Sequence, residues 1–341
     1  MLRKIVSYSA AALRLTAGLT AGLTAVLAMM TATPAHAQAD ADNYPAKPVR
    51  VIIPFAAGGS TDILGRLVSE LLNKELGQPF LVVNVTGAGG TIGAIQVAKA
   101  APDGHTLMIG TPGTIINNPN INKDIGYDPI KDYQGVTSVW SQPAVVIVRK
   151  GGRYSTLKEF IADARKRPGA LNYGSSGVGA FNHLSAELFS MLAGVNLTHV
   201  PYKGVAPAVT DLMAGNVDVV FSGISSLLSA SERLAGLAIA APTRSAYSST
   251  LPTSAEAGLP DYHYSSWGGL FSTAGTPPRV TEKLRVAIVK SVGQDMVKKR
   301  FEDQAVDLMI SESVADFQRY VVAEYKKGTQ LIARAKLKND N

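Results

Sequence analysis

Cysteine is absent from the 341-residue sequence. Its absence excludes disulfides, thiolate metal ligands and cysteine nucleophiles. Charged residues are sparse at 17%, and only five histidines are present. None of these histidines has the HExxH or paired spacing of a zinc site, so we expect neither a metal nor a cofactor.

The long apolar run of the chain lies near its N-terminus, from Leu13 to Met30. It follows Arg3 and Lys4 and precedes Ala35-His36-Ala37, an A-x-A cleavage signal. This order predicts a secretory signal peptide over residues 1–37, cleaved after Ala37. A membrane anchor is the alternative, but Arg14 interrupts the run and small residues follow it closely. We therefore expect a soluble protein exported to the periplasm.

Positive charge is also limited in the mature chain. Cleavage removes three basic residues and lowers the formal charge from +7 to +4. A nucleic-acid-binding protein concentrates many more Lys and Arg residues in a patch or stripe. We therefore expect no nucleic-acid partner.

One stretch near the start of the mature chain predicts an anion site. An apolar run from Val51 to Ile53 stops at Pro54, and Gly58-Gly59 and Ser60-Thr61-Asp62 lead into an apolar pattern with helical spacing. A buried strand, a glycine turn and a helix N-terminus bring free backbone N–H groups and the positive end of a helix dipole together. The alternative is that the glycines only turn the chain and Asp62 only caps the helix.

Strand and helix patterns alternate along the rest of the chain. They predict parallel α/β sheets in two domains, formed by residues 44–148 plus 265–341 and by residues 149–264. We expect a long ordered loop over 117–133, a strand over 144–148, and long helices over 278–300 and 314–335. Glycine-rich turns at 58–59, 87–90 and 177–179 each follow a strand, which places them at a cleft between the domains.

Enzyme signatures fail in this sequence. The stretch Gly174-Ser175-Ser176-Gly177-Val178 lacks the second glycine of a nucleophile elbow. His183 either points into the cleft or is a capping or core histidine, whereas His199 lies within a strand and is expected to be structural. Trp267 either covers the ligand or packs at the hinge. The alternative function from another class is a secreted α/β hydrolase that uses His183 and a nearby serine.

The predicted cleft loops contain no Lys or Arg. A carboxylate there would be bound by backbone N–H groups, hydroxyl groups and ordered water. Lys203 either reaches the rim of the cleft or stays solvated.

Motifs spread over nearly all of the mature chain resemble one family. They are Tyr44-Pro45-Ala46-Lys47-Pro48-Val49-Arg50, Pro54 to Asp62, Gly87-Ala88-Gly89-Gly90, Pro102 to Leu107, Tyr127-Asp128-Pro129, Leu171 to Ser175, His183-Leu184, His199 to Gly204, and Glu256 to Pro260. This order resembles the substrate-binding proteins of tripartite tricarboxylate transporters, also called Bug receptors.

The resemblance implies a non-catalytic protein with a type II-like periplasmic binding protein fold, in which two α/β domains close on a small organic acid. It also implies a monomer that delivers its ligand to the membrane subunits of such a transporter or to a sensor protein. The ligand-binding residues that it implies are Phe55, Ala56, Ala57, Gly58, Gly59 and Asp62 in the first turn, and Ser175, Ser176, Gly177, Gly179 and His183 in the second. Weaker candidates are Gly110, Thr111, Tyr202 and Lys203.

Two departures from the family pattern affect the predicted ligand. Ala56-Ala57 stands where the family commonly has Pro-Pro or Ala-Pro, and Ser222 stands where it often has an acidic residue. Loss of that acidic group near the cleft would suit a more anionic or differently shaped ligand, so Ser222 joins the candidate site.

Overall fold

The computed structural model describes residues 43–334, so the predicted signal peptide lies outside the described residues. Within them, a single sheet of ten strands forms the centre of the protein from Lys47 onward. No helix in this part of the chain is both long and apolar enough to cross a membrane.

The strands form the order β2-β1-β3-β9-β4-β7-β5-β6, with β8 and β10 also paired to β4. Strands β1, β2 and β3 are mutually parallel, as are β5, β6 and β7, whereas β4 and β9 run antiparallel to their neighbours. The strands are β1 (Val49–Ile53), β2 (Phe80–Asn84), β3 (Thr106–Gly110), β4 (Tyr133–Arg149), β5 (Asn172–Ser175), β6 (Thr198–Pro201), β7 (Val219–Gly223), β8 (Leu234–Ile239), β9 (Ser265–Thr273) and β10 (Asp307–Leu308).

Helices connect most of these strands and follow the last ones. They are α3 (Ser60–Leu76), α4 (Thr91–Ala98), α5 (Asn118–Ile121), α6 (Leu157–Lys166), α7 (Phe181–Ala193), α8 (Val205–Ala214), α9 (Ile224–Leu228), α10 (Pro278–Val292), α11 (Asp295–Glu302) and α12 (Val314–Arg334), with short helical turns η1 (Ala88–Gly90) and η2 (Gly113–Asn117).

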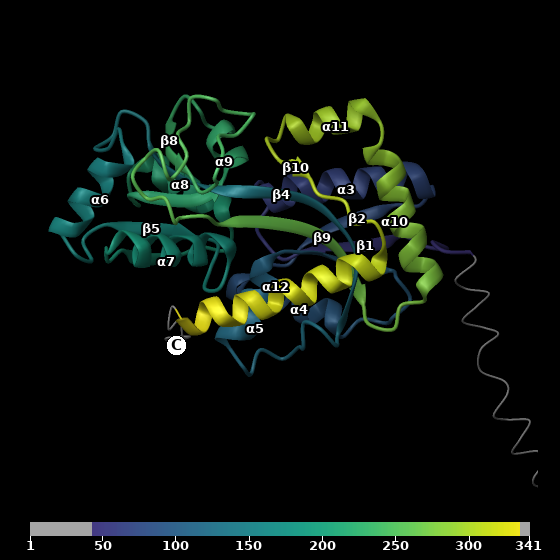
Figure 1. Ribbon diagram of the computed structural model, residues 1–341. Coiled ribbons are helices and arrows are strands. Elements are labelled where there is room, and N and C mark those ends of the chain that lie inside the picture. Colours follow the sequence, from purple (N-terminus) through teal and green to yellow (C-terminus); the bar gives the residue numbers. More distant parts are fainter. Residues whose placement is uncertain (1–42, 335–341) are drawn as a thin grey trace, which may run out of the picture. The chain divides into compact units, whose positions relative to one another are not determined.

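The long strand β4 connects the two parts of the sheet (Figure 1). Up to Pro143 it pairs with β9, and from Ala144 onward it pairs with β7 and β8. The predicted strand over 144–148 was therefore far too short. The predicted loop over 117–133 was also partly wrong, because α5 and part of η2 occupy its beginning.

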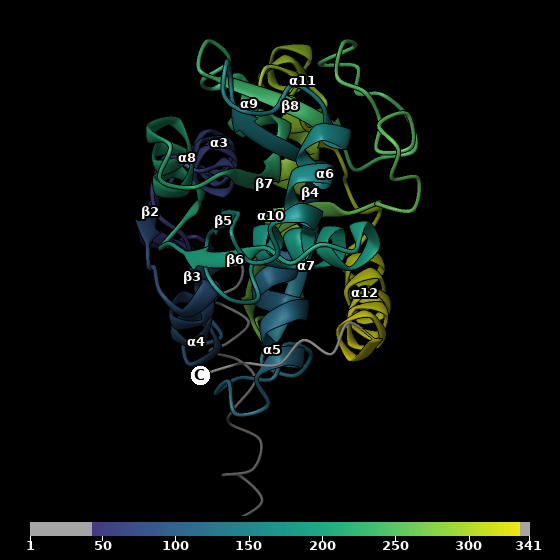
Figure 2. The same ribbon diagram turned by 90° about the vertical axis from the view of Figure 1, so that its left-hand side faces the viewer.

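Side chains alternate between the two faces of β4, and each face has its own core. Ala144, Val146 and Val148 pack with α6 and α7, whereas Val145 and Ile147 pack with α8 and α9. Figure 2 shows α6 and α7 in front of this part of the sheet. A third cluster joins β1, β3, α4, β9 and α12. Hydrophobic packing is thus separate on either side of the point where β4 changes partners.

Local sequence features mark two helix ends. The Thr156 hydroxyl accepts from the Glu159 N–H and the Glu159 carboxylate accepts from the Thr156 N–H, which completes a capping box at α6. Gly77 ends α3 in the left-handed conformation, with φ of 68°. The single helix expected over 278–300 is wrong, because Gly293 and Gln294 separate α10 from α11.

Candidate functional site

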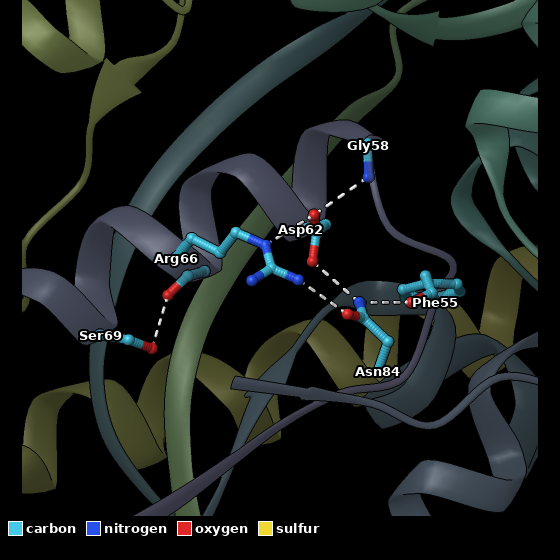
Figure 3. A network of polar contacts seen from close by, with 7 residues as sticks. Phe55, Gly58, Asp62, Arg66, Ser69 and Asn84 are labelled. Atoms are coloured by element: carbon cyan, nitrogen blue, oxygen red, sulfur yellow. Dashed lines mark hydrogen bonds and ion pairs between the residues drawn. The ribbon is translucent and has the colours of Figure 1, made fainter. Parts of the chain in front are cut away.

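The turn between β1 and α3 is held by the carboxylate of Asp62. Its Oδ2 accepts from the Gly58 N–H at 3.0 Å and from Arg66 Nε at 3.0 Å, and its Oδ1 accepts from Asn84 Nδ2 at 2.8 Å (Figure 3). Asn84 Nδ2 also donates to the Phe55 carbonyl at 2.9 Å. Asp62 therefore fixes the glycine turn as well as the first turn of the helix.

These contacts also determine the charge of Asp62, which is buried. Burial alone would raise its pKa, but hydrogen bonds from Arg66, the Gly58 N–H and Asn84 outweigh burial and hold the pKa below its ordinary value. Asp62 is therefore ionised at neutral pH, and its charge is balanced by Arg66.

The turn between β5 and α7 is held by neutral groups. His183 Nδ1 accepts from the Gly179 N–H at 3.1 Å, and the Ser175 hydroxyl accepts from the Gly177 N–H at 3.0 Å. Ser175 Oγ also lies 2.5 Å from His199 Nε2. The rings of His183 and His199 lie 4.4 Å apart, and that of His199 stacks on Tyr173.

Burial favours the neutral form of both imidazoles. It lowers the pKa of His183 to about 3, assisted by the neighbouring His199, and it lowers the pKa of His199 to about 4. A neutral His183 keeps the Nδ1 lone pair that the Gly179 N–H requires. His183 thus supports the second turn from within the protein.

A small polar cavity of about 40 Å³ lies where the two turns meet. Its lining contains no Lys or Arg, and its one charged group, Asp62, is already paired. Hydroxyl and amide side chains supply most of its polar atoms. The lining residues are Phe55, Ala56, Gly59, Ser60, Thr61, Asp62, Thr111, Gln142, Ser176, Phe181, Asn182, Val205, Ser222, Gly223 and Ser266.

Several helices begin at this cavity. Helix α3 begins at Ser60, α7 at Phe181 and α8 at Val205, and all three of these residues line the cavity. The first N–H groups of a helix lack intrahelical acceptors, and each helix N-terminus carries the equivalent of about half a positive charge. Three helix N-termini therefore direct the positive ends of their dipoles at the cavity, an arrangement suited to an anion.

Hydroxyl groups connect the two sides of the cavity. Ser60 Oγ at the start of α3 lies 2.8 Å from Ser225 Oγ in α9, and Ser222 Oγ lies 2.8 Å from Ser226 Oγ. The Ser176 hydroxyl donates to Asn182 Oδ1 at 2.6 Å. These neutral groups can donate or accept, so they can adapt to a ligand without a buried charge.

The binding residues expected from the sequence line the small cavity, line a second cavity, or lie outside both. Seven line the small cavity: Phe55, Ala56, Gly59, Asp62, Thr111, Ser176 and Ser222. Gly177, Tyr202 and Lys203 line a second cavity, and Ala57, Gly58, Gly110, Ser175, Gly179 and His183 line neither.

The second cavity is larger, at about 770 Å³, and fewer hydroxyl and amide side chains line it. Its lining includes apolar residues such as Ile121, Ile125 and Val178, and its one cation, Lys203, is exposed. Size alone favours it as a ligand site. We favour the small cavity because buried polar side chains and helix N-termini converge there.

Several cavity residues were missed from the sequence. Gln142 and Ser266 face each other on β4 and β9, 124 positions apart along the chain, and no local pattern connects them. Ser60 and Asn182 are close in sequence to expected residues, and their positions at helix starts could have identified them.

Trp267 is not part of the cavity lining; it packs against Phe317 and Phe271 in a hydrophobic core. No cluster of metal-ligating side chains occurs within residues 43–334.

Known protein families and solved structures include close matches to this chain. Residues 64–337 match the model of the tripartite tricarboxylate transporter family receptor. Three similar solved structures each cover 85–86% of this chain. The periplasmic binding protein BugD is 29% identical, with 99% of its chain covered and a TM-score of 0.82.

The other two structures contain ligands. Rpa4515 of R. palustris, with adipate, is 35% identical, with 98% of its chain covered and a TM-score of 0.82. MatC of Rhodopseudomonas palustris, with bound malate, is 32% identical, with 100% of its chain covered and a TM-score of 0.80. These similarities confirm the α/β periplasmic binding protein fold expected from the sequence.

Proposed function

Because the chain belongs to the tripartite tricarboxylate transporter receptor family, a family of periplasmic solute-binding proteins and not of enzymes, we propose that it captures a small carboxylate in the polar cavity. The alternative of a hydrolase using His183 and a nearby serine is therefore wrong. His183 supports the second glycine turn from outside the cavity lining.

The carboxylate assignment is carried by one observation, the convergence of three helix N-termini on a buried cavity with no cationic side chain. Backbone N–H groups at helix starts bind carboxylates through charge-assisted hydrogen bonds. The adipate and malate of the two related structures are both acids of this kind. The ligand class is therefore small organic acids, with the seven expected residues of the cavity among its binding groups.

Ligand capture requires the protein to open. A cavity of about 40 Å³ has room for only a few water molecules and is smaller than a four-carbon acid. We assign residues 149–264 to one moving domain, and residues 44–148 and 265–341 to the other, as the sequence predicts. The cluster on β1, β3, α4, β9 and α12 is separate from the two clusters that pack on β4 after Pro143, which supports this division.

The same proposal covers location and partners. The N-terminal pattern of a signal peptide and the periplasmic relative support export, with cleavage after Ala37. The receptor delivers its carboxylate, as a monomer, to transporter membrane subunits or to a sensor protein.

Thermal melting of residues 38–341 tests the ligand class. The panel contains malate, adipate, other carboxylates, sugars, cationic amino acids and esters. A ligand present at about 100 times its dissociation constant adds about 2.7 kcal/mol to the free energy of unfolding. We expect a shift with carboxylates only, with the acid recovered unchanged.

Two results would contradict the proposal. One is a panel in which no carboxylate shifts the melting temperature while a sugar or cation does so. The other is turnover of an ester that is lost in a His183→Asn variant.

A further inference from the structure

The polar side chains of the small cavity fall into two groups. Ser60, Ser176, Ser222 and Asn182 already form hydrogen bonds with other side chains. Thr111, Gln142 and Ser266 are each at most 6% exposed, yet Thr111 Oγ1, Gln142 Nε2 and Ser266 Oγ make no hydrogen bond within residues 43–334. Buried polar groups are normally hydrogen-bonded, so three such groups in one cavity require an explanation.

These three atoms are not sealed by packing. The buried polar atoms that lack both a partner and solvent contact lie elsewhere, for example Trp267 Nε1, and none belongs to Thr111, Gln142 or Ser266. All three residues line the cavity. Their uncommitted polar atoms are therefore accessible to a molecule that enters it.

The Gln142 side chain is positioned mainly by packing, because its carboxamide lies directly against Gly223. Its Oε1 also lies 3.5 Å from the Ser225 hydroxyl, at the long end of a hydrogen bond. A Cβ at position 223 would lie 1.9 Å from Gln142 Oε1, so only glycine leaves space for this amide. The Oε1 atom faces Ser225, and Nε2 remains as the donor for a ligand.

The three residues come from three neighbouring strands. Thr111 directly follows β3, Ser266 lies on β9 and Gln142 lies on β4, and these strands are adjacent in the order β3-β9-β4. Gln142 and Ser266 are directly opposite in the β4–β9 register. Cβ atoms of such pairs lie about 5 Å apart, close enough for one carboxylate to receive a hydrogen bond from each side chain.

We propose that Gln142 Nε2 and Ser266 Oγ bind one carboxylate of the ligand, with Thr111 Oγ1 as a third donor. The inference rests on the proposed function and adds binding residues to it. Gln142 lies next to the point where β4 changes partners, so this donor belongs to the crossing strand itself. Gln142 would therefore contact the ligand from the strand that connects the two moving domains.

Titration calorimetry with malate, adipate and any other acid from the panel tests this inference. Gln142→Glu keeps the shape of the side chain but replaces the donor with an anion, which repels a carboxylate in contact with it. We expect roughly hundredfold weaker binding or more. Gln142→Met should weaken binding about tenfold, and Ser266→Ala and Thr111→Val about three- to tenfold each.

Gln134→Glu is the matched control, because it makes the same chemical change on the same strand, outside the cavity lining. It should bind each acid as the unaltered protein does. If Gln142→Glu does not melt cooperatively, the other three cavity variants decide. Binding within twofold of the unaltered protein in all folded cavity variants would overturn the inference while leaving the proposed function intact. An unaltered protein that binds no carboxylate would instead overturn the proposed function, and the inference with it.

Discussion

The two glycine turns beside the cavity have the same local plan and different supports. Each connects a parallel strand to a helix whose N-terminus reaches the cavity. The first turn is held by the ionised carboxylate of Asp62, whereas the second is held by neutral His183 and Ser175. Neither support places a Lys or Arg side chain in the cavity lining.

The difference shows how one geometry is obtained with a buried charge and without one. Asp62 has the half-exposed guanidinium of Arg66 beside it, so its charge stays balanced. The second turn lies over the rings of Tyr173, His199 and His183, which are buried or partly buried, and an ion there would be costly. The two supports should therefore respond differently to mutation and to pH.

Removal of the Asp62 charge should give the largest effect on the free energy of unfolding. Asp62→Asn weakens contacts to Gly58, Arg66 and Asn84, and hydrogen bonds to charged groups contribute about 1.5–3 kcal/mol each. We expect a loss of roughly 2–3 kcal/mol, measured by urea denaturation, with weaker acid binding. Asp303→Asn, which removes an exposed pair with Lys299, should cost less than about 1 kcal/mol. Equal losses in the two variants would show that Asp62 is an ordinary surface carboxylate.

Acid should affect the second turn at higher pH than the first. An unfolded histidine titrates near 6.5, whereas burial lowers the pKa of His183 to about 3. The unfolded chain therefore binds more protons below pH 6.5, and the free energy of unfolding falls as the pH drops from there toward the folded pKa. Asp62 has a lowered pKa as well, but its contribution is lost only as the pH falls below about 4, the unfolded value.

His183→Asn separates these two ranges, because it keeps a side-chain acceptor for the Gly179 N–H but takes up no proton. Urea denaturation at pH 7, 6 and 5 should show a pH dependence less steep by up to about 1.4 kcal/mol per pH unit. His263→Asn, at an exposed position, controls for the same change on the surface. An unchanged slope in His183→Asn would mean that other groups cause the acid sensitivity.

The smallest effect should come from the contact between the first turn and the start of α8. The Ala56 N–H donates to the Lys203 carbonyl at 3.2 Å, and a Cβ at position 204 would lie 2.9 Å from Ala56 N. Gly204 has an extended backbone with φ of 173°, so alanine adds a clash without backbone strain. We expect Gly204→Ala to weaken acid binding about threefold to tenfold, because the contact between Ala56 and position 204 must shift. Gly293→Ala, at a position with φ of −67°, should leave binding unchanged.

The sequence determined features that depend on neighbouring residues. The turn from β1 into α3, the capping box at α6 and the glycine end of α3 follow from local backbone preferences. The order of motifs along the chain determined the family and, through it, the fold. Features of this kind can be read from sequence because the interactions behind them span a few residues or recur throughout a family.

Only the tertiary structure decided which side chains meet at the cavity. Pairing of β4 with β9 places Gln142 opposite Ser266, and packing of α3 near α9 brings Ser60 to Ser225. Packing also placed His183 beneath its turn instead of in the cavity lining. Contacts of this kind join residues many positions apart, and strand register and core packing fix them. Local propensity and residue spacing therefore cannot predict these contacts.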